Sequence, residues 1–264
     1  MGATLPPAVR EVRSRDNPLL QRVRRLQRDP VAYRRLGQCW LEGEHLAQAL
    51  VARGGRAGLA LLAESAAGRE PLHGLAAAAT DVVVVPDRLF AELSSLPSSA
   101  GIGLLCDVPA AAALLDRAPT VVLDRLQDAG NVGSILRSAA ALGMRQVVAL
   151  RGTAGLWSPK VLRAGMGSHF ALQLLENADE AVLDGLRIPV LATSSHAPHS
   201  LAQASWDEPC AWVFGHEGQG ISATLQRRCT LTLRIPQPGG EESLNVAAAA
   251  AICLYESMRR REGP

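Results

Sequence analysis

The chain has 264 residues, of which 48% are hydrophobic and 20% are charged. A chain of this size can bury about 70 to 75% of the surface that it exposes when unfolded, which predicts a globular protein of one or two domains. It contains no run of about 18 uncharged apolar residues, and its N-terminal stretch carries charges where a signal peptide has an apolar core, so we expect a cytoplasmic protein without a membrane segment.

The cysteines favour a reducing compartment. They are odd in number, scattered and free of any C-x-x-C pair, at positions Cys39, Cys106, Cys210, Cys229 and Cys253. This spacing argues against a disulfide framework and against a zinc site, so we expect no bound metal.

Positive charge is concentrated near the N-terminus. The net charge of +2 is too small, and the pI near 8.4 too moderate, to indicate nucleic-acid binding. Between Arg10 and Arg35, however, nine arginines stand against three acidic residues, a local excess of six positive charges. Such a segment can bind phosphates. It can equally be the solvated face of a helix in an arginine-rich protein, since Lys160 is the only lysine of the chain.

The first part of the chain predicts a small α/β domain over residues 1–107. Short apolar segments typical of buried strands alternate there with helical periods. The expected strands are QCWLEG, AGLALLAES, DVVVVP and GIGLLCDV, and the expected helices are GEHLAQALVARG, PLHGLAAAAT and PDRLFAELSSL. Residues 108–119, which contain two prolines and an alanine run, are the expected linker.

Residues 120–264 predict a second α/β domain. The expected strands are VVLD, RQVVAL, IPVLATS, CAWVFG and LTLRIP, and the expected helices are NVGSILRSAAALG, DEAVLDGL, SATLQRRC and SLNVAAAAAICLYESMRRR. Continuous apolar strands interleaved with helices imply a mainly parallel sheet with helices on both faces. Ligands of such sheets bind beyond the carboxyl ends of the strands, where this chain has three connectors rich in glycine or polar residues: 125–131, 215–220 and 236–243.

Two common nucleotide-binding patterns are absent from the sequence. GIGLLC and GMGSHF lack the third glycine of the G-x-G-x-x-G pattern, GHEGQG has the wrong spacing, and no Walker motif occurs. The connectors must therefore hold a ligand by other loop chemistry.

Together the three connectors resemble the motifs of the SpoU, or TrmH, family of RNA ribose 2'-O-methyltransferases in the SPOUT superfamily. The matching segments are DAGNVGSILR (128–137), FGHEGQGI (214–221) and IPQPGGEESLNVA (235–247). SRDNPLLQRVRRL and WLEGEHLAQAL are also similar to the family's N-terminal substrate-binding domain, which has an L30e-like fold, so the resemblance covers nearly the whole chain. The family usually has proline at the position of Ala129 and methionine at that of Gln237, which here places an amide near the expected adenosine pocket.

The resemblance implies a fold, a cofactor, partners and a set of residues. It implies a trefoil knot in the second domain, S-adenosyl-L-methionine as methyl donor, tRNA or rRNA as substrate, and a homodimer. The implied catalytic residues are Arg137, Asn131, Glu217, Ser243 and Asn245. The implied cofactor-binding residues are Thr193, Gly215, Glu217, Gly220, Ile235, Pro236, Ser243, Leu244 and Asn245. We expect RNA to contact Arg22, Arg24, Arg25 and Arg28.

Several of these residues also have a structural interpretation. Asn131 and Ser243 each stand near the start of an expected helix, where either can act as the N-cap. Glu217 has no evident structural role unless it pairs with Asn131 or Arg137 across the strand ends. Arg137 lies on a mostly apolar helix that we expect to be buried, where an arginine needs a partner such as an RNA phosphate. Because a guanidinium stays protonated, we expect Arg137 to stabilise a developing alkoxide, with Asn131 and Glu217 orienting it.

Three classes of function remain on this sequence. They are an RNA 2'-O-methyltransferase, a catalytically inactive RNA-binding or ribosome-assembly factor on the same scaffold, and an α/β enzyme acting on a small molecule. The intact polar positions of the three motifs disfavour the second class, and the resemblance of the N-terminal segment to an RNA-binding domain disfavours the third. The sequence therefore favours the enzyme, with tRNA and rRNA both open as its substrate.

Overall fold

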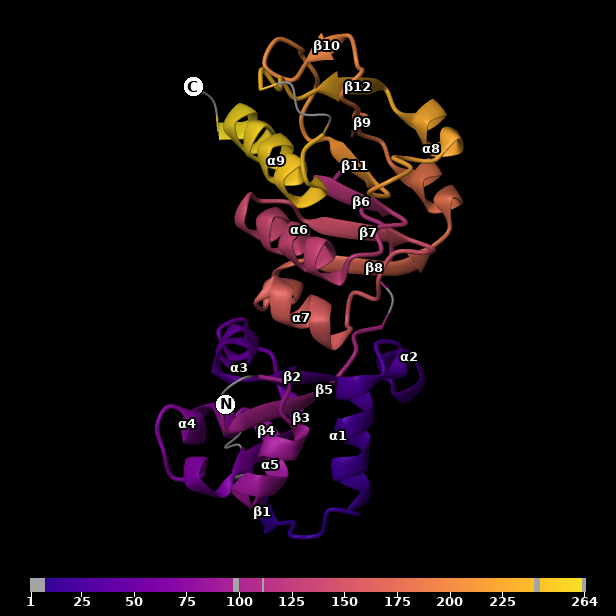
Figure 1. The fold of residues 1–264 in the computed structure, drawn as a ribbon. Coiled ribbons are helices and arrows are strands. Elements are labelled where there is room, and N and C mark those ends of the chain that lie inside the picture. The colour runs from indigo at the N-terminus through magenta and orange to yellow at the C-terminus, as the bar shows by residue number, and fades with distance from the viewer. Residues whose placement is uncertain (1–7, 97–99, 111, 240–242, 263–264) are drawn as a thin grey trace. The chain divides into compact units, whose positions relative to one another are not determined.

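The computed structural model describes residues 8–96, 100–110, 112–239 and 243–262. The chain divides into two compact units (Figure 1). One comprises the chain up to Pro109 together with Trp157–Phe170, and the other comprises Ala110–Leu156 together with the chain from Ala171 onward. Residues 157–170 thus count with the first unit, although they lie inside the range 120–264 that the sequence assigns to the second domain.

The first unit is built on a mixed sheet whose described strands follow the order β1-β4-β3-β5-β2. β1 and β3 run parallel to β4, whereas β5 runs antiparallel to both β3 and β2. The strands are β1 (Ala8–Glu11), β2 (Gln38–Glu42), β3 (Ala57–Ala63), β4 (Ala79–Val85) and β5 (Ile102–Asp107). The helices are α1 (Pro18–Arg28), α2 (Ala32–Leu36), α3 (Glu44–Val51), the 3-10 turn η1 (Glu64–Ala66), α4 (Leu72–Ala76), α5 (Asp87–Leu93) and α7 (Pro159–Gly165), which the 3-10 turn η2 (Ser168–Ala171) follows.

Helix α1 shows how the local sequence sets the packing of this unit. The side chain of Asn17 caps the helix by accepting an amide of the first turn at 2.9 Å, and Pro18 occupies a position where no N–H is needed. Leu20, Val23 and Leu26 recur every three residues and are buried. The arginines between them are thereby left mainly on the outer side of the helix.

The second unit is built on a parallel sheet whose described strands follow the order β10-β12-β9-β11-β6-β7-β8. The strands are β6 (Thr120–Asp124), β7 (Gln146–Leu150), β8 (Gln173–Ala178), β9 (Val190–Thr193), β10 (His199–Ser200), β11 (Ala211–Gly215) and β12 (Leu231–Arg234). The helices are α6 (Ala129–Ala141), the 3-10 helix η3 (Glu180–Gly185), α8 (Ala223–Arg228) and α9 (Val246–Glu262).

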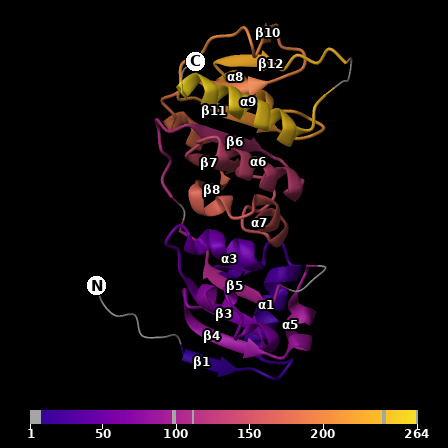
Figure 2. The same cartoon turned by 90° about the vertical axis from the view of Figure 1, so that its left-hand side faces the viewer.

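Side chains alternate between the two faces of this sheet. On one face Val213 packs with Leu183 of η3 and Leu225 of α8. The preceding residue, Trp212, faces the other way, and its indole N–H donates to the buried Ser257 hydroxyl of α9 at 2.7 Å. Figures 1 and 2 show α6 and α9 lying along that second face, with α8 on the opposite one. The prediction of a parallel sheet covered by helices on both faces is confirmed.

The strand order brings the three connectors together at the carboxyl end of the parallel strands. β6 and β11 are hydrogen-bonded neighbours with Asp124 opposite Gly215, and β9 joins β11 to β12. Because these strands are parallel, the loops that follow Asp124, Gly215 and Arg234 all leave the sheet at the carboxyl end of the strands. This is the end of the sheet at which the sequence predicts a ligand.

The predicted strands are present with shifts of a few residues at their ends, but other elements were missed. β8 (QLLENA) is largely half-buried and lies at one edge of the sheet, so its sequence lacks the apolar run that identified the other strands. The segment DEAVLDGL forms the 3-10 helix η3 instead of an α-helix. Within the described ranges, no helix is long and apolar enough to cross a bilayer.

Candidate functional site

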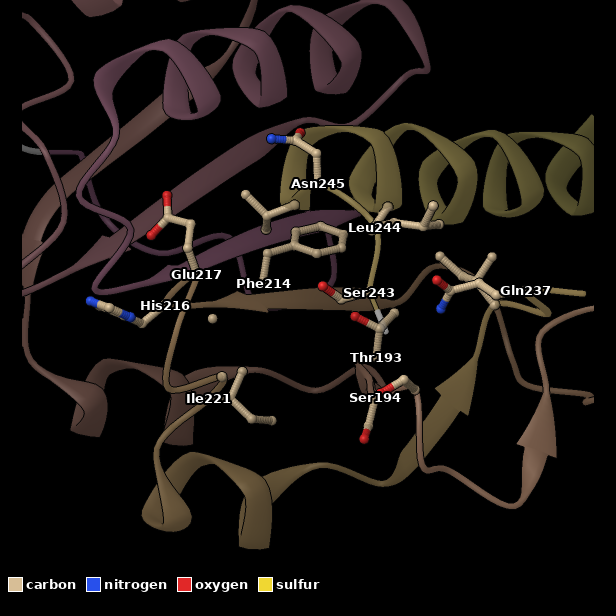
Figure 3. Close-up of a pocket in the computed structure, with 16 residues that line it drawn as sticks. Thr193, Ser194, Phe214, His216, Glu217, Ile221, Gln237, Ser243, Leu244 and Asn245 are labelled. Atoms are coloured by element: carbon tan, nitrogen blue, oxygen red, sulfur yellow. The ribbon is translucent and has the colours of Figure 1, made fainter. Parts of the chain in front are cut away.

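A cavity of about 360 Å³ opens at this end of the sheet in the second unit. Its walls come from the ends of β9 and β11, the loop after β11, the connector between β12 and α9, and the first turn of α9. Figure 3 shows His216 and Glu217 at one end of the cavity and Gln237 at the other. In the described part of the chain, no cluster of three or more His, Cys, Asp or Glu side chains could hold a metal ion.

The loop after β11 is a tight turn that presents Glu217. The Gly220 amide donates to the His216 carbonyl oxygen at 2.8 Å, and His216 Nδ1 accepts from two further amides of the loop at 3.0 and 3.2 Å. A methyl group on Gly215 would collide with the backbone of Gly220, so only glycine lets the loop fold back this closely. Gly215, the first glycine of the second motif, is therefore required by the close return of the loop.

Three of the predicted catalytic side chains form a hydrogen-bonded chain at the edge of the cavity. Asn131 Nδ2 on α6 donates to Glu217 Oε1 at 3.2 Å, and Asn245 Nδ2 donates to Asn131 Oδ1 at 3.1 Å. The pairing of Glu217 with Asn131 across the strand ends, which the sequence suggested, is present. Each side chain comes from a different motif, so this chain of bonds links all three connectors.

The charge on Glu217 sets the direction of these bonds. Partial burial pushes the pKa of Glu217 upward, but hydrogen bonds from its own amide, from the Asn131 side chain and from the amides of Asp128 and Gln127 outweigh burial and leave the pKa below its ordinary value. A carboxylate that is ionised at neutral pH can only accept hydrogen bonds. Asn131 must therefore turn its Nδ2 to Glu217 and its Oδ1 to Asn245.

The two helices at the site begin differently from the prediction. Asp128 caps α6 by accepting the Asn131 amide at 2.7 Å, which leaves the Asn131 side chain available to Glu217. Asn245 caps α9, because its Oδ1 accepts two amides of the first turn at 2.9 and 3.3 Å. The interpretations of Asn131 and Ser243 as caps are wrong, and Ser243 instead lines the cavity two residues before the true cap.

Arg137 is exposed on α6, so the expectation of a buried arginine is wrong. The buried side of α6 is formed by residues such as Val132 and Leu136, and Arg137 lies outside it. Among the described residues, Arg137 makes no hydrogen bond or ion pair, and it does not line the cavity. Asn131 and Glu217 bond each other and do not orient it. The helix is apolar on average but is covered on one side only, which leaves this guanidinium available to a ligand.

Asp124 and Arg125 hold the loop after β11 through hydrogen bonds that the sequence did not predict. Asp124 is only 1% exposed and accepts the Ser222 amide at 2.8 Å. Arg125 donates to both oxygens of Asp124 at 2.9 and 3.2 Å, to Gln219 Oε1 at 3.0 Å and to the Gly220 carbonyl oxygen at 3.3 Å. Arg125 has a φ of 58°, a left-handed conformation that residues other than glycine rarely adopt. This strained residue and its carboxylate partner therefore anchor the far end of the loop.

The structure places the predicted cofactor-binding residues around one cavity. All of them except Pro236 line it, and Pro236 lies between two residues that do. Residues 240–242 of the third motif lie outside the described part of the chain. Gln237, whose amide the sequence places near the adenosine pocket, also lines the cavity, and lining residues that were not predicted include Ser194, Phe214, His216, Ile221 and Val246. Phe214, His216 and Ile221 belong to the second motif, which was a signal that could have identified them, whereas Ser194 lies in no motif.

The predicted RNA-binding arginines lie on α1 of the first unit. Arg22, Arg25 and Arg28 are exposed and recur every three residues, so they share one side of the helix. Arg24 is different, because it donates to the Arg15 carbonyl oxygen at 2.7 Å and pairs with a glutamate of α5 at 3.6 Å. Arg24 is therefore used inside the unit. Arg22 stays exposed but donates to Gln38 Oε1 at 3.2 Å, whereas the side chains of Arg25 and Arg28 make no hydrogen bond or ion pair among the described residues.

The sequence and the fold are similar to those of known methyltransferases. The sequence model of the SpoU rRNA Methylase family matches residues 118–255. An uncharacterized tRNA/rRNA methyltransferase of Synechocystis is 31% identical over 96% of this chain and 95% of that protein. The 23S rRNA (guanosine(2553)-2'-O)-methyltransferase RlmP of Bacillus subtilis is 32% identical over 65% of this chain and 70% of that protein. The crystal structure of the SpoU methyltransferase AviRb of Streptomyces viridochromogenes, in complex with the cofactor AdoMet, superposes with a TM-score of 0.82 at 26% identity, over 93% of this chain and 98% of that one.

Proposed function

We propose that this chain transfers a methyl group from S-adenosylmethionine to a ribose 2'-hydroxyl in structured RNA. The chain belongs to the SpoU rRNA methylase family. The observation that carries the proposal is the cavity of about 360 Å³ with the bonded side chains of Asn131, Glu217 and Asn245 at its edge. An inactive RNA-binding factor would have no need to keep these three polar groups aligned. The enzyme is therefore favoured over its alternative.

The lining of the cavity fits this cofactor. A volume of about 360 Å³ lies within the range of small-molecule sites, roughly 300 to 1,000 Å³. Ile221, Ile235 and Leu244 offer apolar surface to a flat base, and Thr193 and Ser243 offer hydroxyl groups to a ribose. S-adenosylmethionine, when bound, would supply a methyl group on a positively charged sulfur, and an oxygen nucleophile can bond to that methyl carbon while the neutral thioether leaves.

The residues of the chain align the ribose hydroxyl and stabilise the charge that it develops. Glu217 holds Asn131 in one orientation, and the helix cap holds Asn245 in another, so the nucleotide meets fixed polar groups. Ser243 positions the same nucleotide from the cavity wall. Arg137 binds the neighbouring RNA phosphate and stabilises the alkoxide, while the proton leaves to phosphate or water, because a guanidinium has no acceptor for it.

The first unit is proposed to hold the RNA. We assign residues 1–107 to an L30e-like substrate-binding domain, 108–119 to a linker and 120–264 to the methyltransferase domain. The exposed Arg22, Arg25 and Arg28 support this assignment, since their guanidinium groups are accessible to phosphates. Ribosomal RNA is the first candidate substrate because the Bacillus subtilis relative is a 23S rRNA methyltransferase, and tRNA is the second. An RNA substrate of this kind places the enzyme in the cytoplasm.

A homodimer is proposed as the working form. Ile252 and Tyr255 on α9 are 41% and 55% exposed and lie about one turn apart, which is apolar surface that the sheet does not cover. A trefoil knot in the second unit is proposed on the family resemblance alone. Light scattering at micromolar concentration should report about twice the chain mass of 27.9 kDa, and a monomer would contradict the dimer.

A methyl-transfer assay tests the proposed function. The purified protein is incubated with S-adenosylmethionine and with rRNA or tRNA from cells that lack its gene. New ribose positions that resist alkaline cleavage are expected in one of the two RNAs, and DNA of the same sequence, which has no 2'-hydroxyl, is expected to take up no labelled methyl group. RNA binding without any transfer to either RNA would favour the inactive factor instead.

A further inference from the structure

Gln237 contributes a buried and unpaired oxygen to the cavity wall. It lies in the connector between β12 and α9, and its side chain is half-buried. The side-chain Oε1 is shielded from solvent and has no hydrogen-bond partner among the described residues. Buried polar atoms of native proteins are nearly always hydrogen-bonded, so an orphan oxygen in a ligand cavity indicates a donor that the ligand supplies.

The position of Gln237 indicates which part of the ligand it meets. Figure 3 shows Glu217 at one end of the cavity, Thr193 and Ser243 between, and Gln237 at the other end. Glu217 is bonded to Asn131 and through it to Asn245, so the reacting groups belong at that end. A donor molecule in which sulfur, ribose and adenine follow one another then has its ribose near the two hydroxyl groups. Its adenine comes to the end that Gln237 occupies.

We propose that the Gln237 carboxamide hydrogen-bonds the amine-bearing edge of the adenine and makes the cavity selective for adenosine. This inference rests on the proposed function. The carboxamide oxygen accepts from the exocyclic amine, and Nε2 donates to the adjacent ring nitrogen, which is the pairing by which glutamine recognises adenine in nucleic acids. A methionine of similar length at this position would fill the same space without either bond.

Paired ligands and a matched variant test the contact by binding alone. The ligands are S-adenosylhomocysteine and its analogue in which hydrogen replaces the 6-amino group, and calorimetry measures both with the full chain. Gln237→Met should raise the Kd for S-adenosylhomocysteine about 5- to 10-fold, the scale of two lost hydrogen bonds, and the Kd for the analogue only about 2- to 3-fold, because the analogue keeps just the bond to the ring nitrogen. Gln203→Met, at an exposed glutamine that does not line the cavity, is the control and should change neither.

The outcomes separate this inference from the proposed function. An unchanged Kd for S-adenosylhomocysteine in Gln237→Met, or an equal loss for both ligands, overturns the adenine contact while the function stands. Failure of the unmodified chain to bind S-adenosylhomocysteine overturns the proposed function and the contact with it. Thermal melting of Gln237→Met is measured in parallel, and Gln237→Leu repeats the test if the first variant is unstable.

Discussion

Asn245 caps a helix and also hydrogen-bonds Asn131, for which a catalytic role is proposed. Its Oδ1 accepts two amides of α9, and its Nδ2 donates to Asn131. The cap holds the side chain in place, so the second bond needs no further support. Asn245 therefore has one role in helix stability and another in the site. Substitutions that keep the cap but remove the bond to Asn131 can separate these two roles.

We expect Asn245→Asp and Asn245→Ala to differ in stability and agree in activity. Aspartate keeps the capping oxygen but has no N–H for Asn131, so urea unfolding should show a loss of a few tenths of a kcal/mol at most. Alanine loses the cap as well, which costs about 1 kcal/mol. Both variants should transfer methyl groups about 5- to 10-fold more slowly, the scale of one hydrogen bond. Normal turnover in Asn245→Asp would show that the bond to Asn131 is not used.

Arg137 is the predicted catalytic residue whose structural setting differs most from the sequence interpretation. Its exposure and its lack of a partner among the described residues leave it free for RNA. We expect Arg137→Ala to lower turnover about 100-fold or more, the scale for loss of a key electrostatic donor. The Kd for S-adenosylhomocysteine should stay within about twofold, because Arg137 does not line the cavity.

Arg145→Ala is the matched control for that variant. Arg145 is also exposed and follows the same helix, but it carries no predicted role. Its removal should leave turnover close to that of the unmodified chain. If Arg137→Ala and Arg145→Ala behave alike, Arg137 has been assigned wrongly.

At the scale of elements, the loop after β11 depends on the end of β6. Asp124 and Arg125 hold it through the Ser222 amide, the Gln219 side chain and the Gly220 carbonyl oxygen. Arg125 makes its bonds from a left-handed backbone, with a φ of 58°. The strain is offset by bonds to a carboxylate that is almost wholly buried.

Arg125→Gly is expected to loosen the loop without straining the backbone. Glycine accepts the left-handed conformation, so the substitution removes the guanidinium alone. The Kd for S-adenosylhomocysteine should rise about 3- to 10-fold, since the bonds to a partly exposed arginine are partly screened. Arg151→Ala, at an exposed arginine that pairs with Asp179 and not with the loop, should have no such effect. Equal affinities for Arg125→Gly and the unmodified chain would show that the loop holds itself.

The elements also show which features a sequence reveals. The apolar runs of β6, β7 and β11 and the alternation of strands with helices predict a parallel sheet. The parallel strand ends suggest either Asn131 or Arg137 as the partner of Glu217, and the structure shows the bond to Asn131. The cap of α9 was not predictable in the same way, because Ser243 and Asn245 are both good caps two residues apart and only packing selects one. The hydrogen bonds between Arg125 and the loop after β11 were not predictable for another reason. A positive φ at an arginine leaves no mark in the pattern of residue types.

At the scale of the whole molecule, recognition of RNA and binding of the cofactor are assigned to different units. The cavity is lined by residues of the second unit alone, and the exposed arginines of α1 belong to the first. Composition alone is compatible with two interpretations of these arginines, a phosphate-binding segment and the solvated face of a helix. The structure narrows the candidates to Arg22, Arg25 and Arg28, because Arg24 is paired within the unit.

Replacing these three arginines together by glutamine should weaken RNA binding in a salt-dependent way. Each lost phosphate contact removes about 0.7 to 0.9 from the slope of log affinity against log salt, so three contacts should lower it by roughly 2 to 3. Arg53, Arg56 and Arg69 are exposed in the same unit, and their joint replacement by glutamine changes the net charge equally. Filter binding across a salt series compares the two variants, and the Kd for S-adenosylhomocysteine should be unchanged in both. If the two slopes fall equally, the effect is one of overall charge, and if neither falls, the arginines of α1 are a solvated face and the RNA is bound elsewhere.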